Sequence, residues 1–544
     1  MPHSFNLPGE RWIPCVLHDG QQEDLSLLDA LTRAPEVREV FDESPLVTVA
    51  LHRLLLAVLH RNFGPANFKA WQSLWRAGKW DTEKLIAYFQ QWRDSFDLFD
   101  NERPFYQVQM MNDAEHHPAV LLKQEAATGN NATLFDHSFS DAPTPLSPAE
   151  AARYLVARQA FSIGGGVGKP FNLCGATLTR GISLLALGDN LFETLALNLL
   201  VYNEEKPIAN TSHDLPAWEH RRPAIPQKEG TPVSGYLDYL TWQSRRIHLI
   251  PEGEPIVVRR CQIQQNLRLP EAPLIFDPFK CYLLDKDKGF RPLPLSTSKA
   301  LWRDSHTLFQ QSAQTGKSAA KRPELFNQLA RIDQARDEGL IEARKIYALT
   351  AYGFATDPGK AASVLLWSRE RLPLPLRYLN DQALVERLGS ALGFADEVAR
   401  ILRSSLRYLA KLLLAPGSDT ASARQPDKND IGNLAKSFAA ESFYWARLEP
   451  HFKTLLIALP QDVRADDYDN NVLLYGERAV PSWALTLQRT AWAAFEETTH
   501  SLDMSARNLK AVASAERQFK RTLGAKMKEF MNQQSATVLP GGDE

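Results

Sequence analysis

The chain has 544 residues, of which 44% are hydrophobic and 23% charged, an ordinary globular composition that allows a large core. With 62 Lys and Arg against 64 Asp and Glu, the net charge is -2, which argues against a protein that coats nucleic acid everywhere but allows local basic patches. We find no signal peptide and no window of about 18 uncharged apolar residues, so we expect a cytoplasmic protein without a membrane span.

Residues 1–375 mix helical and strand-like patterns. Helical periodicity covers 46–63 and 190–202, and strand-like runs cover 255–263, 280–285 and 289–295. Breaks rich in Pro, Gly and Asn separate these stretches. The pattern predicts a large mixed α+β domain with long loops.

From residue 376 the pattern becomes helical. Four amphipathic segments, at about 382–414, 428–459, 481–501 and 504–532, predict a four-helix bundle over 376–536, followed by a disordered tail at 537–544. In the last segment an apolar seam is expected to face the other helices, formed by Leu509, Val512, Phe519, Leu523 and Phe530.

The sequence offers little for metal chemistry. The four cysteines lie far apart, none with C-x-x-C spacing, which is typical of reduced, buried thiols and not of a zinc site. The pairs His116–His117 and Asp136–His137 have no third ligand at a plausible spacing. We therefore expect no metal and no cofactor.

The stretch GGGVGK, residues 164–169, is called the glycine loop here. A P-loop would need Gly at Ile163 and a hydroxyl at Pro170, and a dinucleotide fingerprint would need Gly at Lys169, so neither nucleotide motif is present. Bare backbone beside a cation suits either a flexible surface loop or a loop that contacts a polyanion.

Several stretches together resemble one family. They are RWIPCVLHDGQQEDLSLLDAL (11–31), RPFYQV (103–108), TGNNATLFDHS (128–138), the segment from the glycine loop to residue 200, STSKALWRDSHTL (296–308) and the closing helices. In order and spacing they resemble the large subunit (CasA) of type I-E Cascade, the CRISPR RNA-guided surveillance complex.

The resemblance implies a subunit that is not a nuclease. It would recognise the protospacer-adjacent motif (PAM) of double-stranded DNA from the minor groove, start duplex opening and R-loop formation, and help recruit a helicase–nuclease. Its implied partners are target DNA, the 5′ handle of the CRISPR RNA, and the backbone, handle-holding and small subunits. The glycine loop would meet base edges through the backbone of Gly164, Gly165, Gly166 and Gly168, and Lys169 would hold a phosphate or a groove acceptor.

The resemblance places three further elements. A wedge beside the PAM matches the turn in 351–364, in which Asp357 belongs to the turn signal. Gly359 and Lys360 occupy the tip, where the family commonly has Asn and Gln. A basic finger for the minor groove has four candidates, Arg259, Arg260, Arg268 and Lys280. A loop at 127–139 would dock on the RNA handle and its holder through Asn130, Asn131, Leu134, Phe135 and His137.

The last helix carries a row of cations opposite its apolar seam. Lys510, Arg517, Arg521 and Lys528 form this row, which we call the basic stripe. It is either a solvated face or an electrostatic track for DNA, which would add salt dependence without sequence specificity. Two other functions stay open: a metal-dependent nuclease, and a purely structural scaffold subunit.

Overall fold

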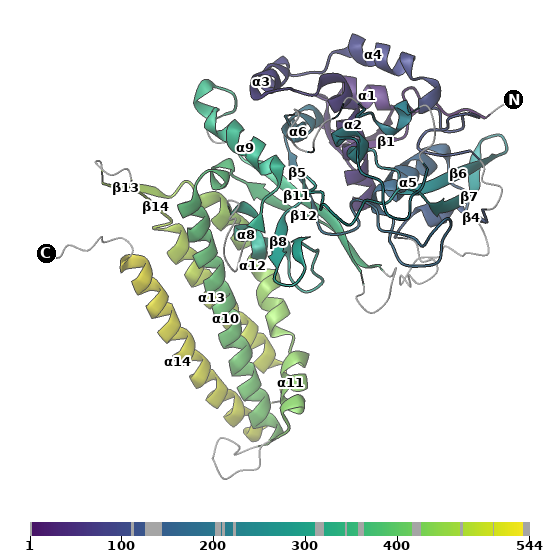
Figure 1. The fold of residues 1–544 in the computed structure, drawn as a ribbon. Coiled ribbons are helices and arrows are strands. Elements are labelled where there is room, and N and C mark those ends of the chain that lie inside the picture. The colour runs from purple at the N-terminus through teal and green to yellow at the C-terminus, as the bar shows by residue number, and fades with distance from the viewer. Residues whose placement is uncertain are drawn as a thin grey trace. The chain divides into compact units, whose positions relative to one another are not determined.

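The computed structural model divides the chain into two compact units, Met1–Leu301 with Gln311–Leu376, and Trp302–Gln310 with Arg377–Glu544 (Figure 1). The structure describes residues 3–109, 114–125, 144–201, 208, 211, 213–220, 225–310, 320–342, 345–356, 364–415, 426–467, 472–503 and 505–536. The predicted tail at 537–544 lies outside them.

The first unit combines helices with three-stranded sheets, as the sequence predicted. The strand orders are β2-β1-β3, β4-β7-β6, β10-β8-β9 and β12-β11-β5. Its strands are β1(Ile13–Leu17), β2(Gln22–Leu25), β3(Val37–Val40), β4(His116–Pro118), β5(Ser183–Leu187), β6(Arg245–Glu252), β7(Val257–Gln265), β8(Tyr282–Asp285), β9(Gly289–Pro292), β10(Ala320–Lys321), β11(Tyr347–Thr356) and β12(Val364–Leu374). Its helices are α1(Leu27–Thr32), α2(Pro45–Phe63), α3(Phe68–Ala77), α4(Thr82–Gln91), α5(Pro148–Phe161), α6(Leu191–Asn198), α7(Tyr236–Leu240) and α9(Glu324–Gln334).

Helix α2 is the central core helix of this unit. The Ser44 side chain caps it by accepting from the Val47 N–H, and Pro45 occupies the first turn, where its missing N–H costs nothing. The helix is long and apolar enough to cross a membrane, but 83% of its most apolar window is buried within the protein. Burial of this kind is what a core helix requires.

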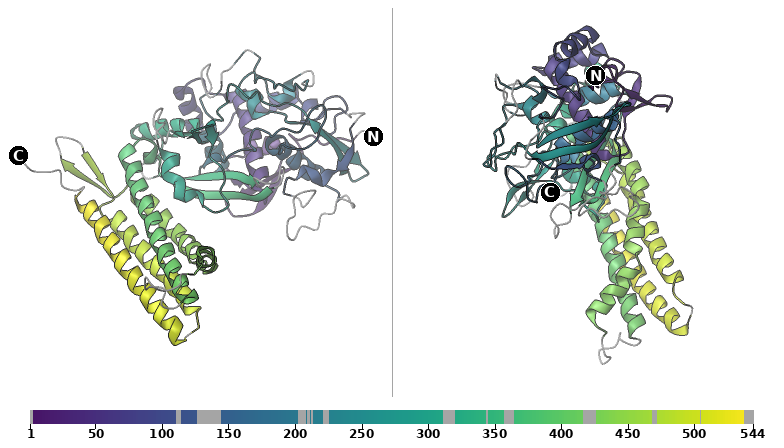
Figure 2. Two further views of the ribbon diagram at one scale, coloured as in Figure 1. Left: turned by 60° about the horizontal axis from the view of Figure 1, so that its bottom comes forward. Right: turned by 90° about the vertical axis from the view of Figure 1, so that its right-hand side faces the viewer.

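The second unit is a helical bundle. Helix α10(Gln382–Leu414) packs against α13(Ala479–His500) and α14(Ala506–Ala536), and α12(Ala440–Ala458) packs against α13. Figure 2 shows these long helices side by side from two further directions. The predicted fold class, α+β with a C-terminal four-helix bundle, is confirmed.

Three details of the second unit differ from the prediction. The expected helix 428–459 is broken into α11(Lys428–Ser437) and α12, where Ala439 has a positive φ of 52°. The predicted break at 460–471 contains the start of a hairpin, β13(Val463–Asp467) with β14(Val472–Tyr475). The segment 302–310, which holds α8(Ser305–Phe309), was expected in the first domain; it joins the bundle because Trp302 is buried there and stacks on Phe452 at 4.8 Å between ring centroids.

Candidate nucleic-acid interface

The glycine loop is the outer part of a hairpin-like segment, residues 163–174, which we call the loop hairpin. It follows directly on α5, whose Ser147 and Glu150 form a capping box. Two hydrogen bonds close the hairpin, from Gly165 N–H to Leu173 C=O at 2.9 Å and from Leu173 N–H to Gly166 C=O at 3.2 Å. The segment therefore has a fixed internal register.

The glycines are needed first for the shape of the hairpin itself. A Cβ on Gly164 would lie 2.6 Å from the backbone nitrogen of Gly175, and one on Gly168 would lie 2.9 Å from the Leu173 side chain. Gly166 has a φ of +134°, which side chains other than glycine rarely adopt. The sequence predicted that all four glycines contact a partner, and Gly164 and Gly168 also have a close internal packing role that the sequence did not reveal.

The tip of the loop hairpin is open. Gly165, Gly166 and Lys169 are exposed, and the Val167 side chain between the glycines is 94% exposed. Within the described residues, the N–H groups of Gly166 and Val167 and the C=O of Val167 have no hydrogen-bond partner. The tip thus exposes unpaired main-chain groups, the apolar side chain of Val167 and the cation of Lys169. The two hydrogen bonds between its limbs hold the hairpin closed behind the tip.

The hairpin of β11 and β12, which is predicted to carry the wedge, packs beside the loop hairpin. Strands β11 and β12 pair from Tyr347↔Leu374 to Thr356↔Val364, and the seven residues between them, including Asp357, Gly359 and Lys360, lie outside the described residues. Near the end of β11, the Phe354 ring lies 5.8 Å from that of Phe161, the last residue of α5.

A second contact joins the same two elements. A Cβ built on Gly353 of β11 would lie 3.4 Å from the carbonyl oxygen of Gly181, in the limb that leads from the loop hairpin into β5. Both ends of the glycine-loop region therefore pack against the outer half of β11. The two contacts join residues 193 and 172 positions apart in the sequence, which the fold brings together.

The four finger candidates have different surroundings. Arg259 and Arg260 project from β7 and share Glu252, at 3.8 Å and 3.1 Å. Arg268 pairs with Glu271 at 3.2 Å. It lies three residues beyond Gln265, whose N–H donates to the Lys169 C=O at 3.0 Å. Arg260 precedes Gln265 on β7. Because a strand rises about 3.3 Å per residue, the two residues lie about 17 Å apart along the strand.

Lys280 is unsuited to the finger role that the sequence allowed it. The residue is 3% exposed, and its ammonium donates to the Thr177 C=O at 2.8 Å and the Arg180 C=O at 2.7 Å. Burial lowers the pKa of Lys280 to about 8. A side chain fixed in this way stabilises the limb after the loop hairpin and cannot reach into a groove.

The remaining predicted elements are the handle-docking loop and the basic stripe. Asn130, Asn131, Leu134, Phe135 and His137 fall outside the described residues. All four cations of the basic stripe are exposed on α14. The seam opposite them is buried at Phe519, Leu523 and Phe530, but Leu509 is 45% exposed because the helix turns Ala511 and Ala515 inward instead.

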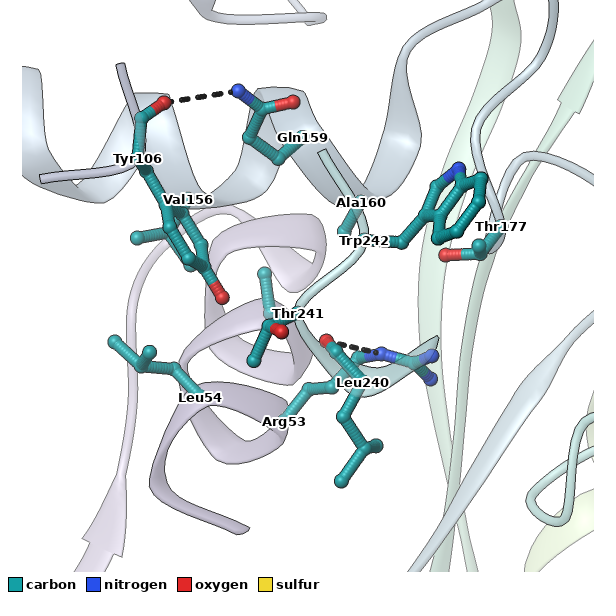
Figure 3. Close-up of a pocket in the computed structure, with 11 residues that line it drawn as sticks. Arg53, Leu54, Tyr106, Val156, Gln159, Ala160, Thr177, Leu240, Thr241 and Trp242 are labelled. Carbon is teal, nitrogen blue, oxygen red and sulfur yellow. Dashed lines mark hydrogen bonds between the residues drawn. The ribbon is translucent and has the colours of Figure 1, made fainter. Parts of the chain in front are cut away.

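Metal ligands and one small cavity were considered as marks of another site in the described part of the chain. No group of three or more His, Cys, Asp or Glu side chains in the described part of the chain could hold a metal ion. A cavity of about 10 Å³ beside Arg53, Gln159 and Trp242, drawn in Figure 3, is at the lower limit for a single water molecule. Three of the four free cysteines are buried, and burial raises the pKa of Cys15, Cys261 and Cys281 to about 12.

Comparison with known proteins places this architecture. The family model of CRISPR-associated protein Cse1 matches residues 6–494. The chain belongs to the Cse1 family. It is 33% identical over 530 residues to the CRISPR-associated protein CasA/Cse1 of Thermus thermophilus, which covers 96% of this chain and 97% of that relative. The resemblance drawn from the sequence is thereby confirmed.

Solved structures agree with Cse1 membership. The crystal structure of CasA from Thermus thermophilus is 28% identical, with a TM-score of 0.77 over 96% of this chain and all of that one. A chain in a CRISPR RNA-guided surveillance complex is 23% identical, with a TM-score of 0.72 over 95% of this chain and 100% of that one. At that identity the second likeness shows the fold alone.

Sequence reasoning on this Cse1 chain missed three residues that shape the interface. Val167 was passed over between glycines, although an apolar residue in a glycine run is a usable signal. Arg245 and Gln265 support the loop hairpin from below and have no motif that would reveal them. Their role follows from the pairing of β6 with β7, which cannot be read from a single sequence.

Proposed function

We propose that the chain is the non-catalytic large subunit of a cytoplasmic CRISPR RNA-guided surveillance complex and recognises the PAM of double-stranded DNA through its glycine loop. The Cse1 family supports the complex as the setting. The observation that carries the proposal is the packing of the loop hairpin's flanks on the outer half of β11, through Phe161 with Phe354 and Gly181 with Gly353. The glycine loop, which would recognise the PAM, and the hairpin that would carry the wedge would thus form one rigid assembly.

The tip of the loop hairpin has the chemistry that a minor groove requires. That groove is about 6 Å wide and offers a degenerate acceptor pattern, so backbone groups without side chains fit it better than long side chains do. The unpaired groups of Gly166 and Val167 would face base edges. The exposed Val167 side chain would supply an apolar contact of the kind minor-groove binders use, and Lys169 would meet a phosphate.

Duplex opening would start at the neighbouring hairpin. Exchange of a DNA duplex for an RNA–DNA hybrid is nearly balanced in free energy, so a local cost at the first base step decides the outcome. Strands β11 and β12 would carry the turn at 357–363 to that step, where Asp357, Gly359 and Lys360 hold the strands apart. Arg268, the finger candidate closest in sequence to Gln265, whose N–H binds the Lys169 C=O, would add a cation, and the basic stripe would hold flanking phosphates.

The remaining partners follow from the same family. The loop at 127–139, with Asn130, Asn131, Leu134, Phe135 and His137, would dock on the 5′ handle of the CRISPR RNA and its holder. Backbone and small subunits would complete the complex, and a helicase–nuclease would be recruited to the opened target. Cutting of DNA is assigned to that enzyme and not to this chain.

The test is Gly166→Leu in the complex reconstituted with its guide RNA and partner subunits. A side chain at φ +134° is strained and bulky at the tip, so we expect the affinity for PAM-bearing duplex to fall about tenfold or more. Affinity for PAM-less duplex and assembly of the complex should stay unchanged.

Gly20→Leu is the matched control. Gly20 also has a positive φ, of +87°, and open space around its missing Cβ, but it lies in the turn between β1 and β2. Its variant should bind both duplexes as the wild type does. Equal affinity of the wild-type complex for PAM-bearing and PAM-less DNA would refute the proposed function.

A further inference from the structure

Two buried side chains on neighbouring strands lie directly beneath the loop hairpin. Arg245 is the first residue of β6 and Gln265 the last of β7, and the antiparallel register pairs them with each other. Their exposed fractions are 1% and 0%. The guanidinium Nη1 of Arg245 donates to the Gln265 Oε1 at 3.0 Å, which fixes both groups. We call this pair the clasp.

The clasp holds the loop hairpin at three places. Nη2 of Arg245 donates to the carbonyl oxygens of Ile163 and Cys174, each at 2.8 Å, which are the first and last residues of the hairpin. The Gln265 Oε1 accepts from the Cys174 N–H at 2.7 Å, and the Gln265 N–H donates to the Lys169 C=O at 3.0 Å. Both ends and the outer limb are therefore tied to the same sheet.

The position of Arg245 is in turn fixed from the helix that precedes the loop. Gln159 of α5 accepts from the Arg245 N–H at 2.9 Å and donates to its carbonyl oxygen at 2.9 Å. The same amide donates to the Tyr106 C=O at 3.1 Å, as Figure 3 shows. The clasp thus stands on a hydrogen-bonded layer that joins α5 to β6.

The charge of Arg245 has an unusual set of partners. Within the described residues no carboxylate pairs with it, and the acceptors of its guanidinium are backbone carbonyls and one amide oxygen. Burial, and after it the charge of Arg158, lowers the pKa of Arg245 to about 9, so the group remains charged at neutral pH. A buried cation is costly unless hydrogen-bonded throughout. The loop carbonyls accept both bonds of its Nη2, whereas its Nε has no hydrogen-bond partner among the described residues. Part of the compensation for the buried charge is therefore lost if the hairpin opens.

We infer that Arg245, with Gln265, is a positioning residue that fixes the shape of the loop hairpin before any partner binds. A preformed loop binds without the entropy cost of ordering its backbone. For DNA recognition this inference rests on the proposed function of the glycine loop, but the effect of the clasp on the loop itself does not. The side chain of Arg245 is buried beneath the hairpin, bound to its first and last residues.

The first measurement is hydrogen exchange in the full chain without DNA. In Arg245→Lys the charge stays, but an ammonium cannot span the two carbonyls that the guanidinium fork bridges. The amides of Gly165, Leu173 and Cys174 should exchange about tenfold faster or more. Each hydrogen bond lost from a charged donor lowers the equilibrium constant for the closed loop more than tenfold. Amides in the core of α2 should keep their rates.

Two further variants make the result decisive. Arg246→Lys is the matched control, since strand alternation turns this neighbour to the other face of β6, where it is half-buried. It should leave loop exchange unchanged. Gln265→Met keeps the volume and removes the acceptor for the Cys174 N–H, so it tests the clasp even if Arg245→Lys fails to fold.

The second measurement separates the clasp from the DNA proposal. In the reconstituted complex, Arg245→Lys should reduce the ratio of PAM-bearing to PAM-less affinity about tenfold, with PAM-less affinity unchanged. Unchanged loop exchange in both Arg245→Lys and Gln265→Met would overturn the inference, as would faster exchange spread evenly over the whole unit. Faster loop exchange with full discrimination retained supports the clasp and counts against PAM reading by the loop.

Discussion

The loop hairpin and the basic stripe are both proposed to contact nucleic acid, but they are built in opposite ways. The loop hairpin is irregular main chain whose shape depends on residues far away in the sequence, Arg245 and Gln265. The basic stripe is a face of one regular helix, set by helical periodicity above a seam of Phe519, Leu523 and Phe530. One has a defined shape and little charge, whereas the other has charge and no special shape.

This difference implies a division of labour. Exposed cations attract phosphates of any sequence and respond strongly to salt, whereas groups held in a fixed geometry can discriminate among base edges. Affinity should therefore depend mainly on the stripe and discrimination mainly on the loop. Variants that change one property without the other test this separation.

The largest effect is expected from the basic stripe. Replacing Lys510, Arg517, Arg521 and Lys528 by Gln removes four exposed cations without touching the buried seam. If each meets one phosphate, the slope of log affinity against log salt falls in magnitude by about 3.6. With equal affinities at 1 M salt, affinity at 0.1 M salt then falls about four-thousandfold. Filter binding of the reconstituted complex across a salt series measures both quantities for PAM-bearing and PAM-less duplex.

The control uses two other cations of α14. Lys526 pairs with Glu397 at 3.3 Å and Glu529 at 2.8 Å, and Arg507 donates to the Leu413 carbonyl. Because both are engaged within the bundle, Arg507→Gln with Lys526→Gln should change the salt slope little. A stripe variant that lost discrimination while keeping its salt slope would reverse the proposed division.

A smaller effect, confined to discrimination, is expected at Gly164. Gly164→Ala places a Cβ against the Gly175 backbone, so the hairpin must open. We expect the ratio of PAM-bearing to PAM-less affinity to fall about thirtyfold, with the salt slope unchanged. Competition binding at a single salt concentration gives that ratio directly.

Gly175→Ala is the counterpart on the facing limb. The nearest atom to its Cβ would be Thr179 Cβ at 3.5 Å, an ordinary contact, so the loop should keep its shape. Similar losses in both variants would mean that the crowding at Gly164 does not control the reading surface.

Sequence patterns predicted the regular parts of the molecule well. Periodicity predicted α2, α10 and the burial of Phe519 and Leu523, because the spacing of apolar residues along a helix follows from its geometry. It missed the break at Ala439, where no Gly or Pro marks the change of direction. Leu509 was misassigned because small alanines take the inward positions of the last helix.

The candidate site was harder to predict because its parts depend on tertiary contacts. The glycine run was visible, but the reason for Gly164 lies in the approach of Gly175, and the support lies in Arg245, one residue among many arginines. The sequence suggested that Lys280 is an available cation, but the folded structure buries its side chain. Residue types identify possible chemistry, whereas burial decides which groups can use it.

The smallest expected effect concerns the buried cores of the first unit and of the bundle, and the pH dependence of their stability. The first unit buries His60 on α2, with its ring edge-to-face to Tyr236 at 4.8 Å, whereas the described residues of the bundle include no buried histidine. Burial lowers the pKa of His60 to about 3, and burial also lowers the pKa of His52. At His60 the unfolded chain then binds more protons than the native unit between about pH 3 and 6.5.

The stability that neutral His60 contributes to the first unit should accordingly be fully present above pH 6.5 and decrease as the pH falls below it. At pH 5.5 the contribution lost through His60 is about 1 kcal/mol. His60→Phe keeps an aromatic ring against Tyr236 and removes the titration, so the drop in its free energy of unfolding between pH 7.5 and 5.5 should be smaller by that amount. Urea unfolding at the two pH values measures it, and the bundle serves as the internal reference. A variant as acid-sensitive as the wild type would show that His60 is protonated in the native unit, and the loop would then rest on a core that accepts charge more readily than its burial implies.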